Sequence, residues 1–562
     1  MKAKVLLFIF TSVLSSLFLL GASVVRAEND TEDAPGVFPS IHITTSIDPF
    51  DIDRELWHNG LISVTNAALP EHNFEDTSAR IRGRGNSTWW RGPDKRPLRF
   101  RFDEAQSMFG SEAVATDWIL LANHFDRSLL RNYSALYLGN LLGSMPFTPR
   151  IQNVHLYVNG KYMGVYQLTD ERDVNPGRLE MTWNEDPALS GFIIELDGRA
   201  PDEGVENETY VMANNMAYDI RFPGASGRTP EHMAYVKQYL ENVSHAIRYG
   251  SFDELLELID LDSFIDFYIV QEWTKNSDVH SLSVFMHING EGEDRRLIMG
   301  PLWDFDIAAG NYGNQTMGYG PEGIYAGVVN YWFRYLLNRP EFFEAAADRW
   351  NEIVDAEIAQ TIERIKYLAT NYQEDFERNF IRHDDILTTT RIVVPAEILE
   401  IGSFMGNVEH LLEWYEARTS WLSDFFNGRL EDYDPLWHLV TYHKYDNPIW
   451  IEFNGVYSKL EFPPIMLQFR TLVELEDLAS IFGLEVNFNS ETGLATMKYG
   501  ETVIMHQSHT SFITVNGEHA AFDAPSIIIK DKLFVPIRMI VDALNFGIEW
   551  DSDSRTVSIT GL

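Results

Sequence analysis

The chain has 562 residues, a net charge of −39 and no cysteine, and 45% of its residues are hydrophobic. This negative charge argues against binding to nucleic acid or to an anionic membrane through bulk electrostatics, and the lack of cysteine excludes disulfides, thiolate catalysis and cysteine metal sites. A chain of this length is expected to form about two to four domains, each held together by its hydrophobic core.

The first 27 residues have the pattern of a secretory signal peptide. Lys2 and Lys4 precede an apolar run, and Val25-Arg26-Ala27 places small residues at the offsets for cleavage. A retained signal anchor is the alternative. An acidic leader is expected over residues 28–40, and no later run is apolar enough to predict another membrane span. The pattern therefore predicts an exported, extracytoplasmic protein.

Residues 41–200 are predicted to be rich in strands and turns. Asn159-Gly160 is a strong two-residue hairpin signal between two strand-like runs, and a helix with apolar residues at helical spacing is expected over residues 126–142. Residues 201–430 are predicted to be mainly helical, with helices over 229–272 and 328–426. A strand-rich part followed by a helix-rich part indicates an α+β, two-lobed domain over residues 41–430, and ligands often bind between such lobes.

One β-hairpin is predicted at the junction of these parts. The turn-like run Asn289–Gly292 separates two apolar, β-branched flanks. Folding back at this turn would bring Asp278 and Asp304 to the same end, about 5–10 Å apart. Like charges at that separation are costly unless a cation lies between them, so we expect a shared divalent-metal site. The alternative is two solvated loop acids.

The motif WDFD at residues 303–306 adds a second acid, Asp306, to this end of the hairpin. Its alternation also fits a simpler interpretation, in which Trp303 and Phe305 point into the core and the acids point outward. The pairing with Asp278 favours the metal site.

After a linker over residues 431–447, residues 448–562 contain an internal repeat. The stretch 470–498 aligns without a gap with 532–560, and apolar residues such as Val473 and Val535 match. Each copy has the pattern of a strand, a helix and a hairpin. Two copies would form a small duplicated α+β domain that shares one core.

Seven segments between about residue 40 and 350 carry a recognisable pattern: IRGRGNSTWW (81–90), DKRPLRFRF (94–102), DWILLANHFDRSLLRNYSALYLGNLL (117–142), VHLYVNGKYMGVYQLTDE (154–171), GFIIELD (191–197), KNSDVHSLS (275–283) and GPLWDFDIAAGN (300–311). Together, and in matching order, they resemble the spore coat protein H (CotH) kinase family, a secreted, atypical protein-kinase-like group. The tail from residue 448 resembles the copper-amine-oxidase N-terminal-like repeat domain, whose name does not imply copper binding.

The resemblance implies roles in phosphoryl transfer, which needs a metal on the phosphates and a group that orients the attacking hydroxyl. Asp278 corresponds to the catalytic aspartate that acts as base or orients the hydroxyl. Asp304 corresponds to the main ligand of Mg²⁺ or Mn²⁺, and Asp306 is a second ligand or a substitute for it. Ser283 stands where kinases usually carry a metal-binding Asn, and a hydroxyl is a weaker ligand. Asn276 is a candidate for orienting this loop.

The nucleotide phosphates are expected at the segment GRGNST, residues 83–88, through backbone N–H groups. The residues proposed to bind ATP there are Gly83, Gly85, Asn86 and Ser87.

Lys95 is the predicted catalytic cation that reaches the phosphates, and Arg99 on the same strand is the alternative. Glu171 and Glu195 are candidate partners for Lys95 by position. A further alternative is that DKRPLRFRF is a solvated edge strand, whose basic residues discourage aggregation.

These features imply an exported atypical protein kinase. It would transfer the ATP γ-phosphate to Ser or Thr of a spore-coat, envelope or other extracytoplasmic protein, and the C-terminal domain would attach it to the envelope or to a partner. Nucleic acid is not an expected partner. The alternatives are a non-catalytic cell-surface or coat-assembly protein with a kinase-like fold, and a metal-dependent hydrolase that uses the same acids.

Overall fold

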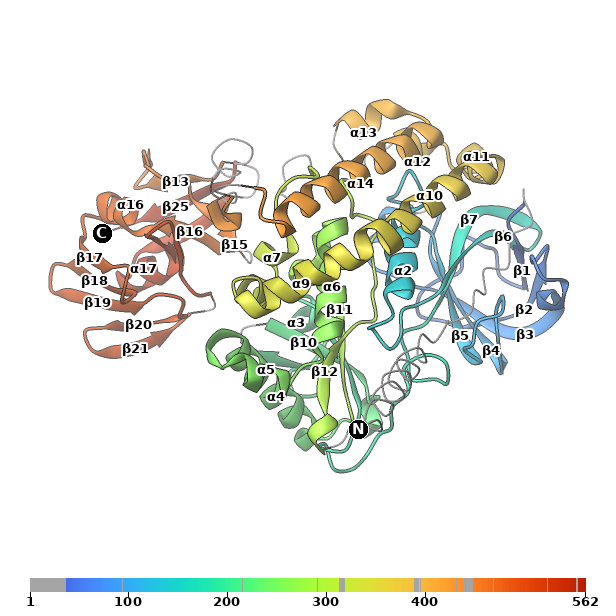
Figure 1. Ribbon diagram of the computed structural model, residues 1–562, viewed down its shortest axis with the longest axis horizontal. Helices are drawn as coiled ribbons and strands as arrows, with labels where there is room; N and C mark the ends of the chain where they lie inside the picture. The colour runs from blue at the N-terminus through green and yellow to red at the C-terminus, as the bar shows by residue number, and fades with distance from the viewer. Residues whose placement is uncertain are drawn as a thin grey trace, which may run out of the picture.

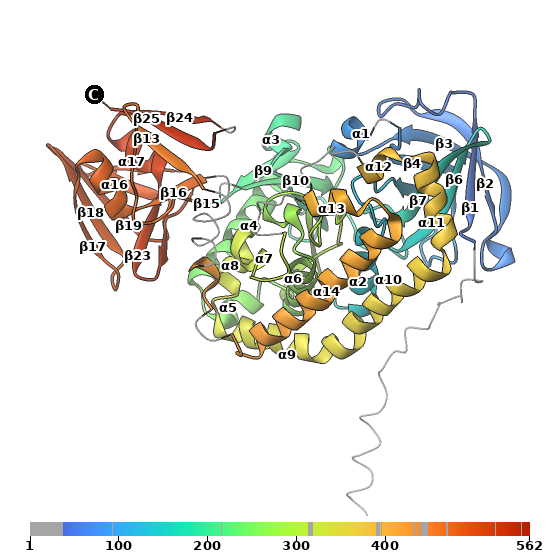
Figure 2. The same cartoon turned by 90° about the horizontal axis from the view of Figure 1, so that it is seen from above.

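The computed structural model describes residues 37–561 apart from 93, 215, 291, 313–318, 389–393, 395, 431–432, 438–439, 441–447, 468–469, 523 and 552–553. The predicted signal peptide, most of the predicted leader and most of the predicted linker lie outside these residues. The fold is mixed α+β, as predicted. A β-barrel and the C-terminal domain lie at opposite ends of an elongated molecule, with a helix-rich body between them (Figures 1 and 2). No helix in the described part of the chain is both long and apolar enough to cross a membrane.

The barrel is closed in the order β1-β2-β3-β4-β5-β7-β6 by parallel pairing of β1 with β6. Its strands are β1 (Ser40–Thr45), β2 (His58–Thr65), β3 (Phe74–Gly83), β4 (Leu98–Gln106), β5 (Ala115–Leu121), β6 (Ile151–Val158) and β7 (Lys161–Asp170). Asn159 and Gly160 both have positive φ, at 51° and 75°, in the turn between β6 and β7. This two-residue turn confirms the predicted hairpin.

Strand β4 alternates strictly between the two faces of the barrel wall. Leu98, Phe100 and Phe102 are buried, while Arg99 and Arg101 point outward. The strand pairs with β3 on one side and β5 on the other. The alternative that DKRPLRFRF is an edge strand is therefore wrong, because both of its backbone edges are hydrogen-bonded inside the sheet.

A second sheet, in the order β12-β11-β8-β10-β9, lies in the helix-rich body. Its strands are β8 (Phe192–Leu196), β9 (Tyr210–Ala213), β10 (Met216–Phe222), β11 (Val284–Asn289) and β12 (Arg296–Met299). Strand β8 falls in the predicted strand-rich part, yet it pairs with β11 and β10 rather than with the barrel. A period of two identifies a strand but not its neighbours, so only the fold reveals this division.

The helices of the body surround α6, in which every residue from Ser263 to Thr274 is buried. The longer helices are α2 (Arg131–Leu142), α4 (Pro230–Tyr249), α6 (Leu261–Thr274), α9 (Pro340–Ile353), α10 (Ala359–Asn371), α11 (Gln373–Arg382) and α14 (Phe404–Phe426). The shorter ones are α3 (Ala200–Glu203), α5 (Phe252–Leu256), α7 (Ala326–Val329), α8 (Tyr331–Leu336), α12 (Asp385–Thr388) and α13 (Ala396–Ile401). The helix α1 (Ser87–Arg91) links β3 and β4. The helices predicted over residues 229–272 are confirmed as α4, α5 and α6.

A buried ion pair joins α6 to α14. Arg418 Nη2 donates to Glu272 Oε1 at 2.6 Å, and neither side chain is more than 1% exposed. Glu272 also accepts from the backbone N–H groups of Tyr325 and Gly327, while Arg418 donates to the carbonyls of Pro321 and Gly323. The pair therefore ties both helices to the segment that precedes α7.

The C-terminal domain has its own buried core, and one of its faces packs on the helix-rich body. Its first part contains β13 (Trp450–Phe453), β14 (Val456–Tyr457), β15 (Ile465–Leu467), β16 (Arg470–Glu474), α16 (Leu475–Phe482), β17 (Glu485–Asn489) and β18 (Leu494–Tyr499). Its second part contains β19 (Thr502–Gln507), β20 (Phe512–Val515), β21 (Glu518–Ala521), β22 (Ile527–Ile529), β23 (Lys532–Pro536), α17 (Ile537–Ala543), β24 (Gly547–Asp551) and β25 (Thr556–Thr560). The matched residues Val473 and Val535 lie directly opposite each other where β16 pairs with β23.

Replacing Arg418 with Met should lower the free energy of unfolding by about 3–5 kcal/mol, because it leaves the carboxylate of Glu272 buried without its cation. Chemical denaturation measures this change. Arg429→Met is the matched control near the end of the same helix, since Arg429 pairs with Asp424 while 65% exposed. The control should cost less than about 1 kcal/mol. Equal losses in the two variants would contradict the structural role given to the buried pair.

Candidate functional site

The predicted hairpin is confirmed as β11 and β12, with Met286 opposite Met299 and Asn289 opposite Arg296. Asp278 lies in the short 3₁₀ helix η3 (Ser277–His280), which leads into β11. Asp304 and Asp306 follow β12 on the returning chain. The three acids therefore meet at the open end of one hairpin, although both strands of that hairpin lie between Asp278 and Asp304 in the sequence.

The carboxylates at this end act on one another electrostatically. Burial, followed by the negative charge of Asp304, raises the pKa of Asp278 to about 8. Burial and the charges of Asp304 and Asp278 also raise the pKa of Asp306 well above its usual range. Such shifts mark carboxylates that lack a compensating cation. Arg199 acts in the opposite direction on Asp278 but does not cancel the effect.

Asn276 links the chain segment that carries Asp278 to the segment that carries Asp304. Its side-chain oxygen accepts from the backbone N–H of Asp278 at 3.2 Å, and its side-chain nitrogen donates to the carbonyl of Asp304 at 3.2 Å. Asp304 has a φ of 65°, a left-handed conformation that is uncommon for a non-glycine residue and often occurs at functional sites. The predicted orienting role of Asn276 agrees with these contacts.

The oxygen atoms at this end suit a hard divalent cation. Ser283 Oγ donates to Asp304 Oδ2 at 3.3 Å, so the hydroxyl lies beside the first predicted ligand. Within the described ranges, no three His, Asp or Glu side chains are close enough to hold a metal ion by themselves. Mg²⁺ is usually bound by one or two carboxylates together with water and substrate phosphates. Asp304 and Asp306 would fit a metal of that kind.

Lys95 lies away from both of its predicted partners. Its side chain is fully buried, its Nζ has no hydrogen-bond partner among the described residues, and it stands 5.3 Å from the ring centre of Tyr166. Burial lowers its pKa to about 7, and the carboxylate that opposes this effect belongs to Asp126. Asp126 in turn raises the pKa of Asp306, so Lys95 is linked to the acidic site only through that residue.

The predicted pairing of Lys95 with Glu171 or Glu195 is wrong, because each of these glutamates pairs with an arginine instead. Glu171 pairs with Arg99 at 3.2 Å, and Glu195 pairs with Arg221 at 2.6 Å. Although burial opposes the effect, the charge of Arg172, followed by that of Arg99, lowers the pKa of Glu171 to about 2. Sequence position placed these acids near a basic strand but could not choose between its cations.

Arg84 is the cation that the sequence analysis missed. The charges of Glu171 and Asp304 both act on it, burial lowers its pKa to about 10, and its guanidinium lies 5.3 Å from the ring centre of Trp303. Arg99, the predicted alternative to Lys95, is instead held by Asp117 at 2.6 Å and by Glu171. The signal for Arg84 was its place between the two glycines of GRGNST.

The two glycines of this segment are required by the local fold. A Cβ on Gly83 would stand 2.1 Å from the ring of Trp89, and Gly85 has a φ of 88°. Asn86 is the residue before α1, without a capping bond from its side chain, and Ser87 is the first residue of that helix. The glycines therefore shape this turn independently of any ligand.

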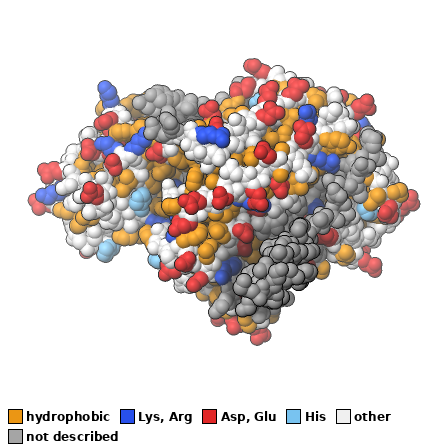
Figure 3. Space-filling view, in the orientation of Figure 1, with side chains coloured by type: hydrophobic (Ala, Val, Ile, Leu, Met, Phe, Trp, Pro, Cys, Tyr) orange, Lys and Arg blue, Asp and Glu red, His pale blue; other side chains and the backbone are white. Residues whose placement is uncertain are grey.

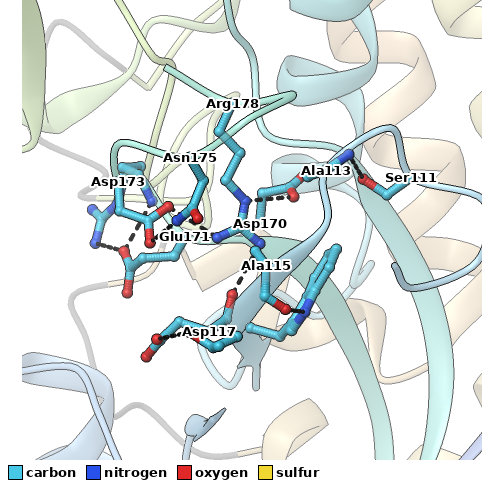
Figure 4. Close-up of polar contacts among 12 residues, drawn as sticks. Ser111, Ala113, Ala115, Asp117, Asp170, Glu171, Asp173, Asn175 and Arg178 are labelled. Atoms are coloured by element: carbon cyan, nitrogen blue, oxygen red, sulfur yellow. Dashed lines mark hydrogen bonds and ion pairs between the residues drawn. The ribbon is translucent and has the colours of Figure 1, made fainter. Parts of the chain in front are cut away.

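A buried arginine fixes the barrel residues beside the site (Figure 4). Arg178 Nε donates to Asp170 at 3.0 Å, its Nη1 donates to Asp173 at 2.9 Å, and its Nη2 donates to the carbonyl of Asp117 at 2.9 Å. These bonds tie β7 to β5, and so they set the positions of the two carboxylates, Asp117 and Glu171, that hold Arg99.

Comparison with known families confirms both resemblances seen in the sequence. Residues 80–422 match the family described as CotH kinase protein, and residues 452–559 match the copper amine oxidase N-terminal domain. The first match covers more than half of the chain and includes the hairpin with its acids and the segment GRGNST. A search of curated proteins found no match.

Asp304→Asn should stabilise the metal-free protein, because the charge of Asp304 raises the pKa of both Asp278 and Asp306. Removing about 1 kcal/mol of repulsion corresponds to a rise of about 1–2 °C in melting temperature for a domain of this size, measured by differential scanning fluorimetry in EDTA. Asp348→Asn is the control, since Asp348 is exposed on α9, and it should leave the melting temperature unchanged. A fall in the melting temperature of Asp304→Asn would contradict the repulsion.

Proposed function

Because the chain belongs to the CotH kinase protein family, we propose that it is an atypical protein kinase that transfers the γ-phosphate of ATP to a Ser or Thr hydroxyl of a protein. The observation that carries this proposal is the meeting of Asp278, Asp304 and Asp306 at the end of one hairpin. Arg84, in the glycine-rich segment of the barrel, lies within electrostatic reach of this cluster. Phosphoryl transfer depends on this kind of positioning and charge neutralisation.

The three acids divide two tasks in this proposal. Asp278 orients the acceptor hydroxyl and takes its proton, a task for which a raised pKa is suited. Asp304 and Asp306, with the Ser283 hydroxyl beside them, hold Mg²⁺ or Mn²⁺. The metal supplies neutralisation of the phosphate charge. The backbone from Gly83 to Ser87 lies on the opposite side of ATP.

Arg84 replaces Lys95 as the proposed cation on the phosphates. Its guanidinium is the one in the glycine-rich segment on which the charge of Asp304 acts. Arg99 is engaged by two carboxylates, and Lys95 is linked to the site only through Asp126. In this arrangement the barrel and the helix-rich body are the two lobes of a kinase-like fold, with ATP between them.

The acceptor is proposed to be a coat or envelope protein outside the cytoplasm. Export rests on the signal-peptide pattern, and the C-terminal repeat domain is a candidate for attachment to the envelope or to a partner. Because ATP is scarce outside cells, phosphorylation would take place in an enclosed compartment. The second candidate is a non-catalytic surface or coat-assembly protein. Ser283 in place of Asn favours it, as does the absence of a three-ligand metal set in the described part of the chain.

ATP with Mg²⁺ should raise the melting temperature of the wild-type protein, and neither should do so alone, because the metal is shared between Asp304 and the phosphates. Saturation at about 100 times the dissociation constant adds about 2.7 kcal/mol of stability, which scanning fluorimetry detects. The shift should vanish in Asp304→Ala and persist in the exposed control Asp348→Ala. Arg84→Met should weaken ATP binding about tenfold or more. A wild-type protein with no nucleotide-dependent shift would be a binding protein rather than a kinase.

Asp278→Asn should lower the rate of transfer by about 10²–10⁴-fold while the ATP-dependent thermal shift remains, because the residue acts on the hydroxyl and not on the nucleotide. The measurement uses γ-labelled ATP and peptide libraries with Ser, Thr or Tyr at a fixed position. Label in the Ser or Thr libraries is the expected result. Release of free phosphate without labelled peptide would identify a hydrolase instead.

A further inference from the structure

A cavity of about 280 Å³ lies between the helix-rich body and the C-terminal domain. One of its walls contains His280, from the same 3₁₀ helix η3 as Asp278, and Ser281, which follows this helix. The remaining lining residues come from both units: Leu196, Gly198, Pro201, Met212, Asn214, Met216, Ala217, Arg248, Tyr331, Arg470, Ser511 and Pro525. The C-terminal domain packs beside this part of the body in both views of the ribbon (Figures 1 and 2).

Two neighbouring arginines that pair with no carboxylate among the described residues place positive charge near this cavity. Arg248 lines the cavity. Arg334 is not one of the lining residues but lies next to Arg248, and the two guanidiniums are 5.0 Å (Arg248) and 5.6 Å (Arg334) from the ring centre of Tyr335. Arg334 is only 3% exposed, and none of its three guanidinium nitrogens has a hydrogen-bond partner among the described residues. The Arg248 Nε and the Tyr335 hydroxyl are likewise buried without a partner in that part of the chain.

Among the residues that the structure describes, no acid compensates the charges of these arginines. The charges that act on Arg334 are those of Tyr335, Tyr331 and Arg248, and burial lowers its pKa. Burying a guanidinium is costly unless it is paired. In a chain with 83 acidic and 44 basic residues, an uncompensated pair of arginines indicates that the negative charge that compensates them comes from outside the chain.

The C-terminal domain holds this pair in place. Arg248 donates through Nη1 to the Tyr331 hydroxyl at 3.0 Å and through Nη2 to the backbone carbonyl of His509 in the C-terminal domain. The charges of both arginines also lower the pKa of His509, after burial. The site is therefore complete only where the two units meet.

We propose that this cavity binds an oxyanion, a phosphate or a carboxylate, beside Arg248, where the positive charge of the neighbouring Arg334 adds to that of Arg248, and that the oxyanion belongs to the acceptor protein. The second part rests on the proposed kinase function. It follows from the wall that the cavity shares with the catalytic segment, because an acidic or phosphorylated side chain held there brings its neighbours towards Asp278. At about 280 Å³ the cavity suits one such side chain, since pockets for larger ligands have about 300–1,000 Å³.

Calorimetric titration of the full chain with inorganic phosphate tests the anion site without ATP or metal. We expect saturable binding to the wild type and a dissociation constant about 10–100-fold higher in Arg334→Met, because the substitution removes one of the two positive charges that attract the oxyanion. The melting temperature of Arg334→Met should not fall, because an unpaired buried charge is removed. Arg538→Met, at an exposed position on α17, should bind phosphate as the wild type does. No binding to the wild type, or equal binding to Arg334→Met, would overturn the site.

Transfer assays with three Ser peptides test the acceptor assignment. One carries a phosphoserine near the Ser, one carries glutamates, and one is neutral. Arg334→Met should raise KM about tenfold or more for the first two peptides and leave KM for the neutral peptide and the ATP-dependent thermal shift unchanged. Equal KM changes for all three, or binding of inorganic phosphate without binding of either anionic peptide, would overturn the acceptor assignment. If the wild type transferred phosphate to none of the three peptides but still bound inorganic phosphate in an Arg334-dependent way, the kinase proposal would be refuted and the anion site would stand.

Discussion

Repulsion among three partly buried carboxylates is the constraint on which the rest of this structure depends. Asp278, Asp304 and Asp306 would separate in an unconstrained chain, because the charge of Asp304 disfavours the charged forms of both Asp278 and Asp306. The hairpin prevents this by placing the chain before β11 and the chain after β12 at one end. Asn276 bonds to both sides, and the buried helix α6 supports the segment that carries Asp278.

The barrel presents the opposite charge to this cluster. Arg84 lies within reach of Asp304, while Arg99 and Arg172 are held by carboxylates that the Arg178 network fixes in position. A divalent metal with a polyphosphate has a cationic and an anionic part, and acids on one side with arginines on the other complement both. Acidic side chains are spread across the face shown in Figure 3 rather than gathered at one place on it. The local arrangement of charges, and not the net charge of −39, therefore distinguishes the site.

Much of the fold could be predicted from the chain. The turn at Asn159-Gly160, the helices over residues 229–272 and the hairpin around Asn289–Gly292 follow from turn chemistry and periodicity, which act over a few residues. The sheet to which β8 belongs could not be predicted in this way, and neither could the central place of β4 in the barrel. Both depend on pairing between strands that are far apart in sequence.

The sequence by itself determined the family, the elements and the types of residue at the acidic end of the hairpin, because motifs and local conformational preferences are written along the chain. Only the tertiary structure decided which charges meet. It brought Lys95 within electrostatic reach of Asp126 and paired Glu171 with arginines. It also brought Arg84 within reach of Asp304, and it placed Arg334 next to Arg248 without an acidic partner among the described residues. Electrostatic and hydrogen-bonding partners are selected by distance in space and by burial, and chain order encodes neither of these once the partners lie on different elements.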